Sequence, residues 1–365
     1  MKVKNRNLKE YLNHLGLAVF FWTLAMTLYA VFRYYGLREE PGISISAEYA
    51  EFYVNYKTFV GFAVFGFLLG ICYATIEFSF EKYVGKRISI GLNILIQFVL
   101  ITISVILISI FLTNIVSKIN GLVLPLERGW WYKDTSFRSL GIYIIFCSFI
   151  FTMMVIAKEK FGDGVLLGML LGKYKHPKEE ERIFMFLDLK SSTAIAEELG
   201  HFKYSQLIQD CFYDMNEITQ EFQAQIYQYV GDEIVLTWPY EKGLAQHNAI
   251  ALFFAFQEKL TSKRAVYEKK YQLLPEFKAG LHGGKLMVAE VGVVKKELAY
   301  HGDVINTTAR IQGACNENKV KFLISEKLLN DFEMKGVDFV SKPIGKVQLK
   351  GKRNPVNIHA LKALV

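Results

Sequence analysis

The sequence predicts two structural halves, an α-helical membrane bundle of four spans followed by an α+β domain built on a mainly antiparallel sheet. The chain of 365 residues is 52% hydrophobic with a mean hydropathy of +0.21, and the excess apolarity lies before residue 158. After residue 182, short apolar runs of strand length alternate with helix-length segments, which is the pattern of an α+β domain. We therefore expect a membrane domain at 1–157, a coupling segment at 158–182 and a second domain at 183–365.

The composition excludes several classes of protein. Charged residues make up only 21% of the chain, too few for a disordered regulator or a coiled-coil fibre. The cysteines, Cys72, Cys147, Cys211 and Cys315, form no CxxC pair, which argues against a disulfide framework or a zinc module. A formal charge of +8 suits nucleic acid, a membrane surface or a polyphosphate ligand. Because the basic residues are dispersed and lack an aromatic-basic motif, we expect no nucleic-acid partner.

Four charge-free stretches are each long enough to cross a lipid bilayer. They are Leu15–Phe32, Thr58–Ile76, Ile88–Ser117 and Ser139–Ala157. A helix needs about 20 apolar residues to span a hydrocarbon core of about 30 Å, so we interpret them as membrane spans rather than core helices of a soluble protein. No small-residue cleavage site follows the first stretch, which argues against a signal peptide.

The distribution of basic residues predicts the orientation of the bundle. Basic side chains precede the first span and fill the turn between the second and third spans: Lys2, Lys4, Arg6, Lys9, Lys82, Lys86 and Arg87. By the positive-inside rule both segments face the cytoplasm, and an even number of spans returns the C-terminus to the same side. We expect a protein integral to the plasma (inner) membrane with both termini cytoplasmic. The outer loops are too short for a folded receptor domain, which needs about 50 residues, so any sensing would use the bundle itself.

The coupling segment contains an apolar patch at Val165–Leu171. Its leucines recur at helical spacing: Leu166, Leu167, Leu170 and Leu171. This spacing predicts an amphipathic helix that either packs on a second copy of the chain or lies on the membrane surface.

The second domain is predicted element by element from its apolar pattern. A buried strand at 183–189 precedes a mostly helical segment at 192–223. Two short strands at 225–230 and 233–238 meet at Gly231-Asp232, and a long helix is expected at about 241–268. Strands at 277–282 and 285–291, a helix at about 304–315 and short strands to residue 360 complete the domain. This order predicts helices on one side of the sheet.

Two aspartates are the first candidates for chemistry. Asp188 ends the buried strand and is followed by Ser191, Ser192 and Thr193, whose N–H groups at a helix start suit phosphate oxygens; Asp188 could equally cap that helix. Asp232 lies at the tip of the predicted hairpin, where Gly-Asp alone is an ordinary turn signal. Two aspartates on adjacent strands can, however, hold two divalent ions about 3.5–4 Å apart, as in enzymes that activate a hydroxyl for attack at phosphorus.

Three motifs together resemble the class III nucleotidyl cyclases, in the membrane-anchored bacterial form. They are Phe186-Leu187-Asp188-Leu189-Lys190-Ser191-Ser192-Thr193, Gly231-Asp232-Glu233, and Gly302-Asp303-Val304-Ile305-Asn306-Thr307-Thr308-Ala309-Arg310. The likeness covers about 183–360. It implies a ferredoxin-like or palm-like sheet with helices, two protomers paired head to tail, and active sites at their interface that convert ATP to cyclic AMP and pyrophosphate with two divalent ions, Mg²⁺ or Mn²⁺.

The resemblance also implies roles for individual residues. Asp188 and Asp232 match the metal-binding aspartates, and Leu189 contributes a main-chain carbonyl. Asn306 matches the asparagine that orients the ribose, and Arg310 matches the arginine that stabilises the pentavalent phosphorus. Lys350 matches the lysine that holds the terminal phosphates.

The chain departs from the family at the positions that select the base. Gln228 stands where the family has a lysine, and Ala299 stands where it has an aspartate or threonine. A glutamine side chain offers both a donor and an acceptor to a purine edge, so adenine is not selected by the usual pair. We expect ATP as substrate, with GTP as an alternative.

We considered three alternative functions. A guanylate or dual-specificity cyclase would share the whole site. A diguanylate cyclase would explain Gly231-Asp232-Glu233, which is similar to the Gly-Gly-Asp-Glu-Phe signature of that family, but Val230 and Ile234 interrupt the signature. Membership of that family would also leave Asn306 and Arg310 without a role. A catalytically silent membrane receptor that only binds nucleotide would not need all four of the matched catalytic and metal-binding side chains.

Overall fold

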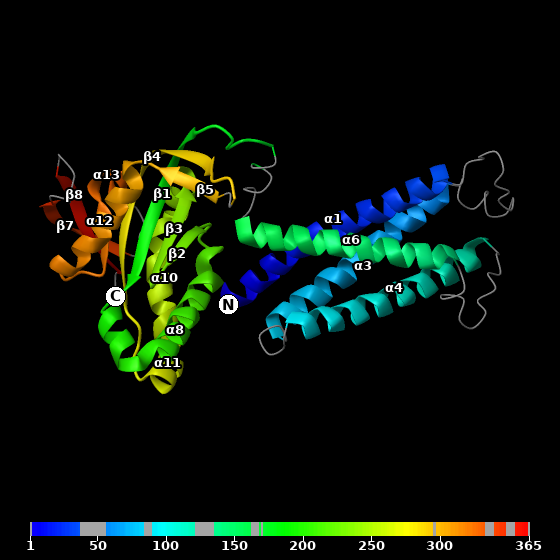
Figure 1. The fold of residues 1–365 in the computed structure, drawn as a ribbon, viewed down its shortest axis with the longest axis horizontal. Helices are drawn as coiled ribbons and strands as arrows, with labels where there is room; N and C mark the ends of the chain where they lie inside the picture. The colour runs from blue at the N-terminus through cyan, green and yellow to red at the C-terminus, as the bar shows by residue number, and fades with distance from the viewer. Residues whose placement is uncertain are drawn as a thin grey trace. The chain divides into compact units, whose positions relative to one another are not determined.

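The computed structural model describes residues 2–36, 56–83, 90–120, 135–161, 168, 171–294, 297–332, 339–347 and 355–363. The chain divides into two compact units, Met1–Lys160 and Phe161–Val365. Figure 1 shows the two units and labels most of their helices and strands. Leu166, Leu167, Leu170 and Lys350, which carry sequence predictions, lie outside the described residues.

The first unit consists of four long apolar helices in its described part. They are α1 (Lys2–Gly36), α3 (Tyr56–Tyr83), α4 (Ile90–Asn120) and α6 (Thr135–Phe161). Each contains a window of 18 to 22 residues that is long and apolar enough to cross a membrane: His14–Tyr35, Phe59–Phe80, Leu95–Leu112 and Arg138–Ala157. These windows overlap all four predicted spans.

Two glycines bring the backbones of α1 and α3 into direct contact. A Cβ atom added to Gly66 would lie 2.4 Å from the Trp22 carbonyl oxygen, and one added to Gly70 would lie 2.6 Å from the Cα of Val19. Small residues four apart on a helix allow this approach, which is common between membrane helices. An interhelical pair, His14 Nε2 to Glu77 Oε2 at 2.8 Å, joins the same two helices.

The second unit contains a mixed sheet with helices. Its elements in order are β1 (Lys178–Leu189), α8 (Ser192–Thr219), β2 (Gln225–Val230), β3 (Glu233–Pro239), α9 (Tyr240–Leu244), a 3₁₀ turn (Ala245–His247), α10 (Asn248–Ser262), α11 (Arg264–Tyr271), β4 (Phe277–Val291), β5 (Glu297–His301), α12 (Asp303–Glu317), β6 (Phe322–Ser325), α13 (Glu326–Leu329), β7 (Phe339–Val347) and β8 (Val356–Ala363). The strand order is β2-β3-β1-β4-β6-β8-β7, with β5 paired to β4. Only β4 and β6 pair in parallel among the described strands.

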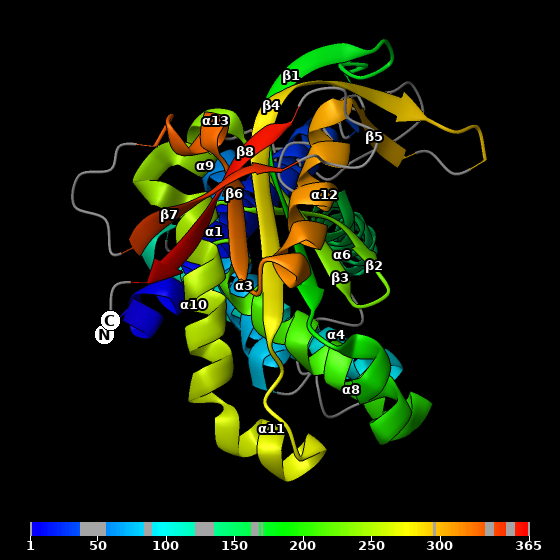
Figure 2. The same ribbon diagram turned by 90° about the vertical axis from the view of Figure 1, so that its left-hand side faces the viewer.

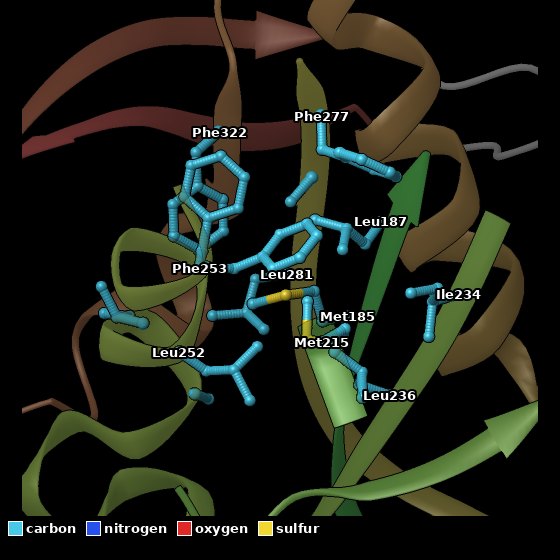
Figure 3. Close-up of a cluster of buried hydrophobic side chains, with 14 of the residues drawn as sticks. Met185, Leu187, Met215, Ile234, Leu236, Leu252, Phe253, Phe277, Leu281 and Phe322 are labelled. Atoms are coloured by element: carbon cyan, nitrogen blue, oxygen red, sulfur yellow. The ribbon is translucent and has the colours of Figure 1, made fainter. Parts of the chain in front are cut away.

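Side chains alternate between the two faces of β1, and each face has its own hydrophobic cluster. Met185 and Leu187 belong to the main core, in which Met215 of α8 and Phe253 of α10 also lie (Figure 3). Phe184 belongs instead to a second cluster on the opposite face, against which residues of α12 pack. We call these two faces the α8/α10 face and the α12 face.

The prediction that the helices lie on one side of the sheet was therefore wrong for α12. Figure 2 shows α10 and α12 on either side of β4. The sequence showed that this segment is helical, but not which face of the sheet it covers, because α12 carries apolar residues for two clusters. Val304 joins the Phe184 cluster, and Ile311 joins another with Leu323 of β6.

Three predicted boundaries also differ from the structure. β1 begins at Lys178 rather than residue 183, since its charged first residues still pair with β4. The long helix expected at 241–268 is interrupted where Gln246 and His247 adopt left-handed backbone angles, and again between α10 and α11.

The strands expected at 277–282 and 285–291 are one strand, β4. Gly283 and Gly284 do not form a turn, because they pair with Ile183 and Arg182 of β1. A Cβ atom on Gly283 would lie 2.7 Å from the ring of Tyr240. Close packing above the sheet, rather than a change of direction, accounts for glycine there.

Candidate active site

Asp188 is the penultimate residue of β1 and has neighbours on both adjoining strands. It pairs with Glu233 of β3 on one side and with Lys278 of β4 on the other. Lys278 Nζ lies 3.1 Å from Asp188 Oδ2. Gln312 of α12 donates from Nε2 to the same oxygen, also at 3.1 Å. The carboxylate is thus fixed from the sheet and from the helix above it.

Asp232 lies in the turn between β2 and β3, beside the end of β1. Gly231, which precedes it, has φ 62°, a left-handed conformation that glycine adopts without strain. The Oδ2 atom of Asp232 is buried and has no hydrogen-bond partner among the described residues. Buried carboxylate oxygens normally have a hydrogen-bond partner. We therefore expect this oxygen to bind a ligand that can accept its lone pairs.

The carboxyl groups of this corner influence one another. Burial raises the pKa of Asp188, Lys278 opposes this, and the charge of Asp232 raises it further, for a net increase. Burial, together with the charges of Asp188 and Asp232, raises the pKa of Glu233 to about 7. Burial and mutual repulsion both disfavour the charged forms of these carboxyl groups, so a bound cation, which offsets both effects, is favoured at this corner.

The donor set fits a hard divalent cation. Asp188 and Asp232 offer carboxylate oxygens, which Mg²⁺ and Mn²⁺ prefer, and one of those oxygens is the unpartnered atom of Asp232. Within the described segments, no group of three or more His, Cys, Asp and Glu side chains could hold a metal ion. A metal here would therefore need ligands beyond side chains of those four types, such as the main-chain carbonyl of Leu189.

The start of α8 lies directly after this corner. Leu189 is buried, and Ser191 adopts a left-handed conformation (φ 58°, ψ 32°), which is unusual for a residue other than glycine. No acidic side chain lies in the first turn of α8, where Ser192 and Thr193 begin the helix. The N–H groups of this turn and the helix dipole thus favour an anion such as a phosphate group.

Asn306 and Arg310 lie one turn apart on α12, where Asn306 is exposed and Arg310 is half-buried. Among the described residues neither side chain has a hydrogen bond or ion pair. Gln312, which contacts Asp188, follows Arg310 by two residues, a rotation of about 200° around the helix. The structure therefore does not bring Arg310 to Asp188 of the same chain, because the two side chains leave opposite sides of α12.

The two base-selecting positions lie on separate strands. Gln228 of β2 pairs with Val235, a member of the cluster on the α12 face, after a bulge between Ile226 and Gln228. Ala299 of β5 alternates with Leu298 and Tyr300, which both pack in that cluster, so its side chain is directed away from it. Within one chain the side chains of Gln228 and Ala299 do not share a face.

A cavity of about 840 Å³ lies at the opposite end of β1 from Asp188. Its wall includes Glu181, Gly284, Asp303 and Lys346, and none of the predicted site residues lines it. The predicted metal-binding and catalytic residues thus form two separate groups, one around Asp188 and one on the outer side of α12, and Gln228 and Ala299 lie apart on β2 and β5.

Comparison with known proteins assigns this second unit to a family. Residues 174–363 match the model of the adenylate and guanylate cyclase catalytic domain, which is more than half of the chain. The chain belongs to the adenylate and guanylate cyclase catalytic domain family. The expected fold class, a cyclase domain preceded by four apolar helices, is thereby confirmed.

Two curated proteins and a solved structure illustrate the similarity. The chain is 34% identical over 215 residues to adenylate cyclase 2 of Rhizobium meliloti (strain 1021), covering 59% of this chain and 58% of that protein. It is 25% identical over 186 residues to an adenylate cyclase of Anabaena cylindrica, covering 49% of this chain and 36% of that protein. The chain thus matches between about a third and three fifths of these relatives' lengths. A bacterial light-regulated adenylyl cyclase shares the fold, with a TM-score of 0.52 and 16% identity over 63% of this chain and 67% of that one.

Sequence reasoning missed three polar neighbours in this cyclase domain: Glu233, Lys278 and Gln312. Glu233 follows Asp232 directly in the motif, but its position opposite Asp188 depends on the pairing of β1 with β3, which the predicted hairpin of β2 and β3 does not fix. Lys278 belongs to no motif, and its contact depends on the pairing of β1 with β4. Gln312 lies on the buried side of α12. Its position in the helix indicates that it faces inward, but does not indicate which residue it contacts.

Proposed function

We propose that this protein is a membrane-anchored homodimeric adenylate cyclase that converts ATP to 3′,5′-cyclic AMP and pyrophosphate. Family membership and the similarity to proteins named adenylate cyclase support the reaction class. The observation that carries the proposal is the corner of Asp188 and Asp232, with its buried unpartnered oxygen, combined with Asn306 and Arg310 facing outward from α12. Each chain thus carries the Asp188 part of one site and the α12 part of another, and neither part is complete by itself.

Pairing of two chains completes both halves. Arg310 points away from its own Asp188, so the carboxylates of one protomer require the α12 helix of a partner. In a head-to-tail dimer two equivalent composite sites form, which is the closed symmetric arrangement favoured by homodimers. The resemblance to the class III family motivates this arrangement.

The residues of one composite site divide the chemistry among them. Asp188, Asp232 and the carbonyl of Leu189 would hold two ions, Mg²⁺ or Mn²⁺. When bound, such ions lower the pKa of the ribose 3′-hydroxyl and neutralise developing charge. The N–H groups at Ser191, Ser192 and Thr193 receive phosphate oxygens, and Lys350 holds the terminal phosphates.

The partner's α12 positions the reacting groups. Asn306 orients the ribose so that its 3′-oxygen attacks the α-phosphorus and the bond to pyrophosphate breaks. Arg310 donates hydrogen bonds to the phosphoryl oxygens as negative charge develops on them. A guanidinium is permanently protonated, so Arg310 stabilises this charge without giving up a proton.

The base pocket distinguishes this protein from a strictly selective cyclase. Gln228 presents an amide that serves either an adenine or a guanine edge, and Ala299 presents no polar side chain. This favours ATP with use of GTP, and a dual-specificity or guanylate cyclase is the second candidate.

The four apolar helices of the first unit would anchor the protein in the plasma membrane, with the N-terminus and the cyclase domain in the cytoplasm. Their spanning length and the basic segments at the predicted inner ends support this placement. The bundle is also the candidate for a regulatory input.

One assay tests the proposal. Purified full-length protein in detergent is given ATP or GTP with Mg²⁺ or Mn²⁺, and products are identified by mass spectrometry. We expect cyclic AMP and pyrophosphate from ATP, and loss of both in Arg310→Ala. Preferential formation of cyclic GMP would assign the second candidate instead, and binding of nucleotide without turnover would identify a silent receptor.

A further inference from the structure

Arg182 of β1 is a buried arginine that the proposed chemistry does not use. It is only 6% exposed. Its Nε donates to Thr237 Oγ1 at 3.1 Å and its Nη1 to Glu180 Oε2 at 3.1 Å. Its Nη2 donates to Gln225 Oε1 at 2.5 Å, and the guanidinium lies 5.0 Å from the centroid of the Tyr300 ring. A buried charge is costly unless its hydrogen bonds are made, so these contacts hold Arg182 in one position.

The partners of Arg182 lie on the two strands that carry the base-selecting positions. Gln225 lies in β2, three residues before Gln228. Tyr300 lies in β5, directly after Ala299. The two strands also meet through rings, since the centroids of Tyr227 and Tyr300 are 4.8 Å apart. Arg182 thus connects two strands that are not neighbours in the sheet order.

Strand β2 depends on such a contact more than the inner strands do. It is an edge strand, paired only with β3 among the described strands, and its ladder is shifted between Ile226 and Gln228. An edge strand with a bulge has fewer main-chain hydrogen bonds to fix its register. The bond from Arg182 to Gln225 therefore anchors the segment just before the bulge that sets the direction of Gln228.

We propose that Arg182 is a positioning residue for base selection, acting through Gln225 on Gln228 and through Tyr300 on β5. The inference rests on the proposed cyclase function and adds to it a determinant of nucleotide preference. Arg182 is too buried to contact the base. The preference for one nucleotide depends on the difference between the hydrogen bonds made to ATP and those made to GTP. A small displacement of the Gln228 amide therefore changes the binding of ATP and of GTP by unequal amounts.

The variant Gln225→Ala tests this inference in the full-length protein. It removes the link to β2 and leaves Arg182 its contacts with Glu180, Thr237 and Tyr300. We expect the ATP/GTP ratio of kcat/KM to change by at least about threefold, with the half-saturating Mn²⁺ concentration unchanged within about twofold. Gln225→Glu keeps an oxygen acceptor for Arg182 and should retain the wild-type ratio.

A double-mutant cycle shows whether the effect passes through Gln228. In a Gln228→Ala background, Gln225→Ala should produce no further change in the ratio, because the amide it positions is gone. As a matched control, Tyr267→Phe removes a buried hydrogen bond to Asp214 on the α8/α10 face and should leave the ratio unchanged. A parallel loss of activity toward both nucleotides in Gln225→Ala, or an equal ratio change in both backgrounds, would overturn the inference.

Nucleotide binding separates this inference from the proposed function. Competition of ATP and GTP against a fluorescent nucleotide gives an affinity ratio even for a protein without turnover. An inactive wild type would refute the cyclase proposal, and its affinity ratio would still respond to Gln225→Ala if Arg182 positions the base pocket. An unchanged affinity ratio in an active enzyme refutes the inference alone.

Discussion

The resemblance to the class III cyclases sets Gln228, which carries an uncharged amide, at the position expected for a lysine. An amide can rotate to present either its N–H or its oxygen first, so in the proposed base pocket it would suit both an adenine and a guanine edge, whereas an ammonium group only donates. The hydroxyl of Tyr229, the next residue, donates to Asn216 of α8 on the opposite face of the sheet. Gln228 is thus the side chain of this segment that is free to face a nucleotide.

We predict weak discrimination between ATP and GTP in the wild-type protein, well below the factor of about 10⁴–10⁵ reached when a site must hydrogen-bond its substrate. Gln228→Lys should change the ATP/GTP ratio of kcat/KM more than it changes the dependence on Mn²⁺, since the side chains that contact Asp188 are those of Lys278 and Gln312. Initial rates with each nucleotide over a metal titration provide both quantities. Rejection of GTP by the full factor would show that other residues recognise the base.

At the scale of single elements, α12 is positioned by one glycine of β4. A Cβ atom on Gly280 would lie 2.3 Å from the main-chain nitrogen of Gln312, so the helix rests directly on the strand. Gln312 in turn donates to Asp188. The height of α12 above the sheet and the orientation of a candidate metal ligand therefore depend on the same contact.

Gly280→Ala should lower stability by about 1–3 kcal/mol, because the helix must move to admit a methyl group. Thermal unfolding followed by circular dichroism measures this change, and kcat should fall together with the melting temperature. Gly313→Ala is the matched control, since no atom lies within 4 Å of the position that its new methyl group would take and alanine favours a helix. Equal stability of Gly280→Ala and the wild type would contradict the close packing of α12 on β4.

The sequence predicted elements well where local signals were complete. The hairpin around Gly231-Asp232 and the helix that carries Asn306 and Arg310 were found, because turn chemistry and helical spacing are local. Lys278 was missed because its proximity to Asp188 arises from the pairing of distant strands. Gly283 and Gly284 were left outside the two strands predicted at 277–282 and 285–291, because local sequence does not reveal that Tyr240 packs against the strand there. The proposed division of Asp188 and Arg310 between two chains was implied by the family resemblance, not by spacing.

For the whole molecule, the first prediction concerns its orientation in the membrane. Basic residues before the first span and the even number of candidate spans predict that both ends of the bundle lie on one side of the membrane. Reporter fusions after Glu10 and after Lys160 should both report the cytoplasm. An external signal after Lys160 would place the cyclase domain away from cytoplasmic ATP and would refute the four-span arrangement.

The second prediction for the whole molecule concerns the shared sites. Asp188→Ala and Arg310→Ala should each be nearly inactive, with the arginine variant losing about 10²–10³ in kcat by analogy with removal of a single oxyanion donor. When the two variants are coexpressed, a heterodimer contains both substitutions in one composite site, and its other composite site has the wild-type residues. Activity per heterodimer should return to as much as about half that of the wild type.

Differently tagged protomers and tandem purification isolate the heterodimer for this measurement. A purely structural role for either residue predicts no recovery, since a misfolded protomer contributes no working half. Heterodimers that form yet remain as inactive as the parent variants would refute the division of the site between two chains.

The position of Gln312 and Arg310 on opposite sides of α12 would couple the two active sites of the proposed dimer. The inner side of this helix contacts the acidic corner of its own chain through Gln312, while in the proposed dimer the outer side would serve the corner of the partner. A rotation or lift of one α12 would therefore disturb two reactions at once, one through a carboxylate and one through a guanidinium. The proposed dimer would then act as a matched pair of sites, and a signal that moved a single helix would change the output of both.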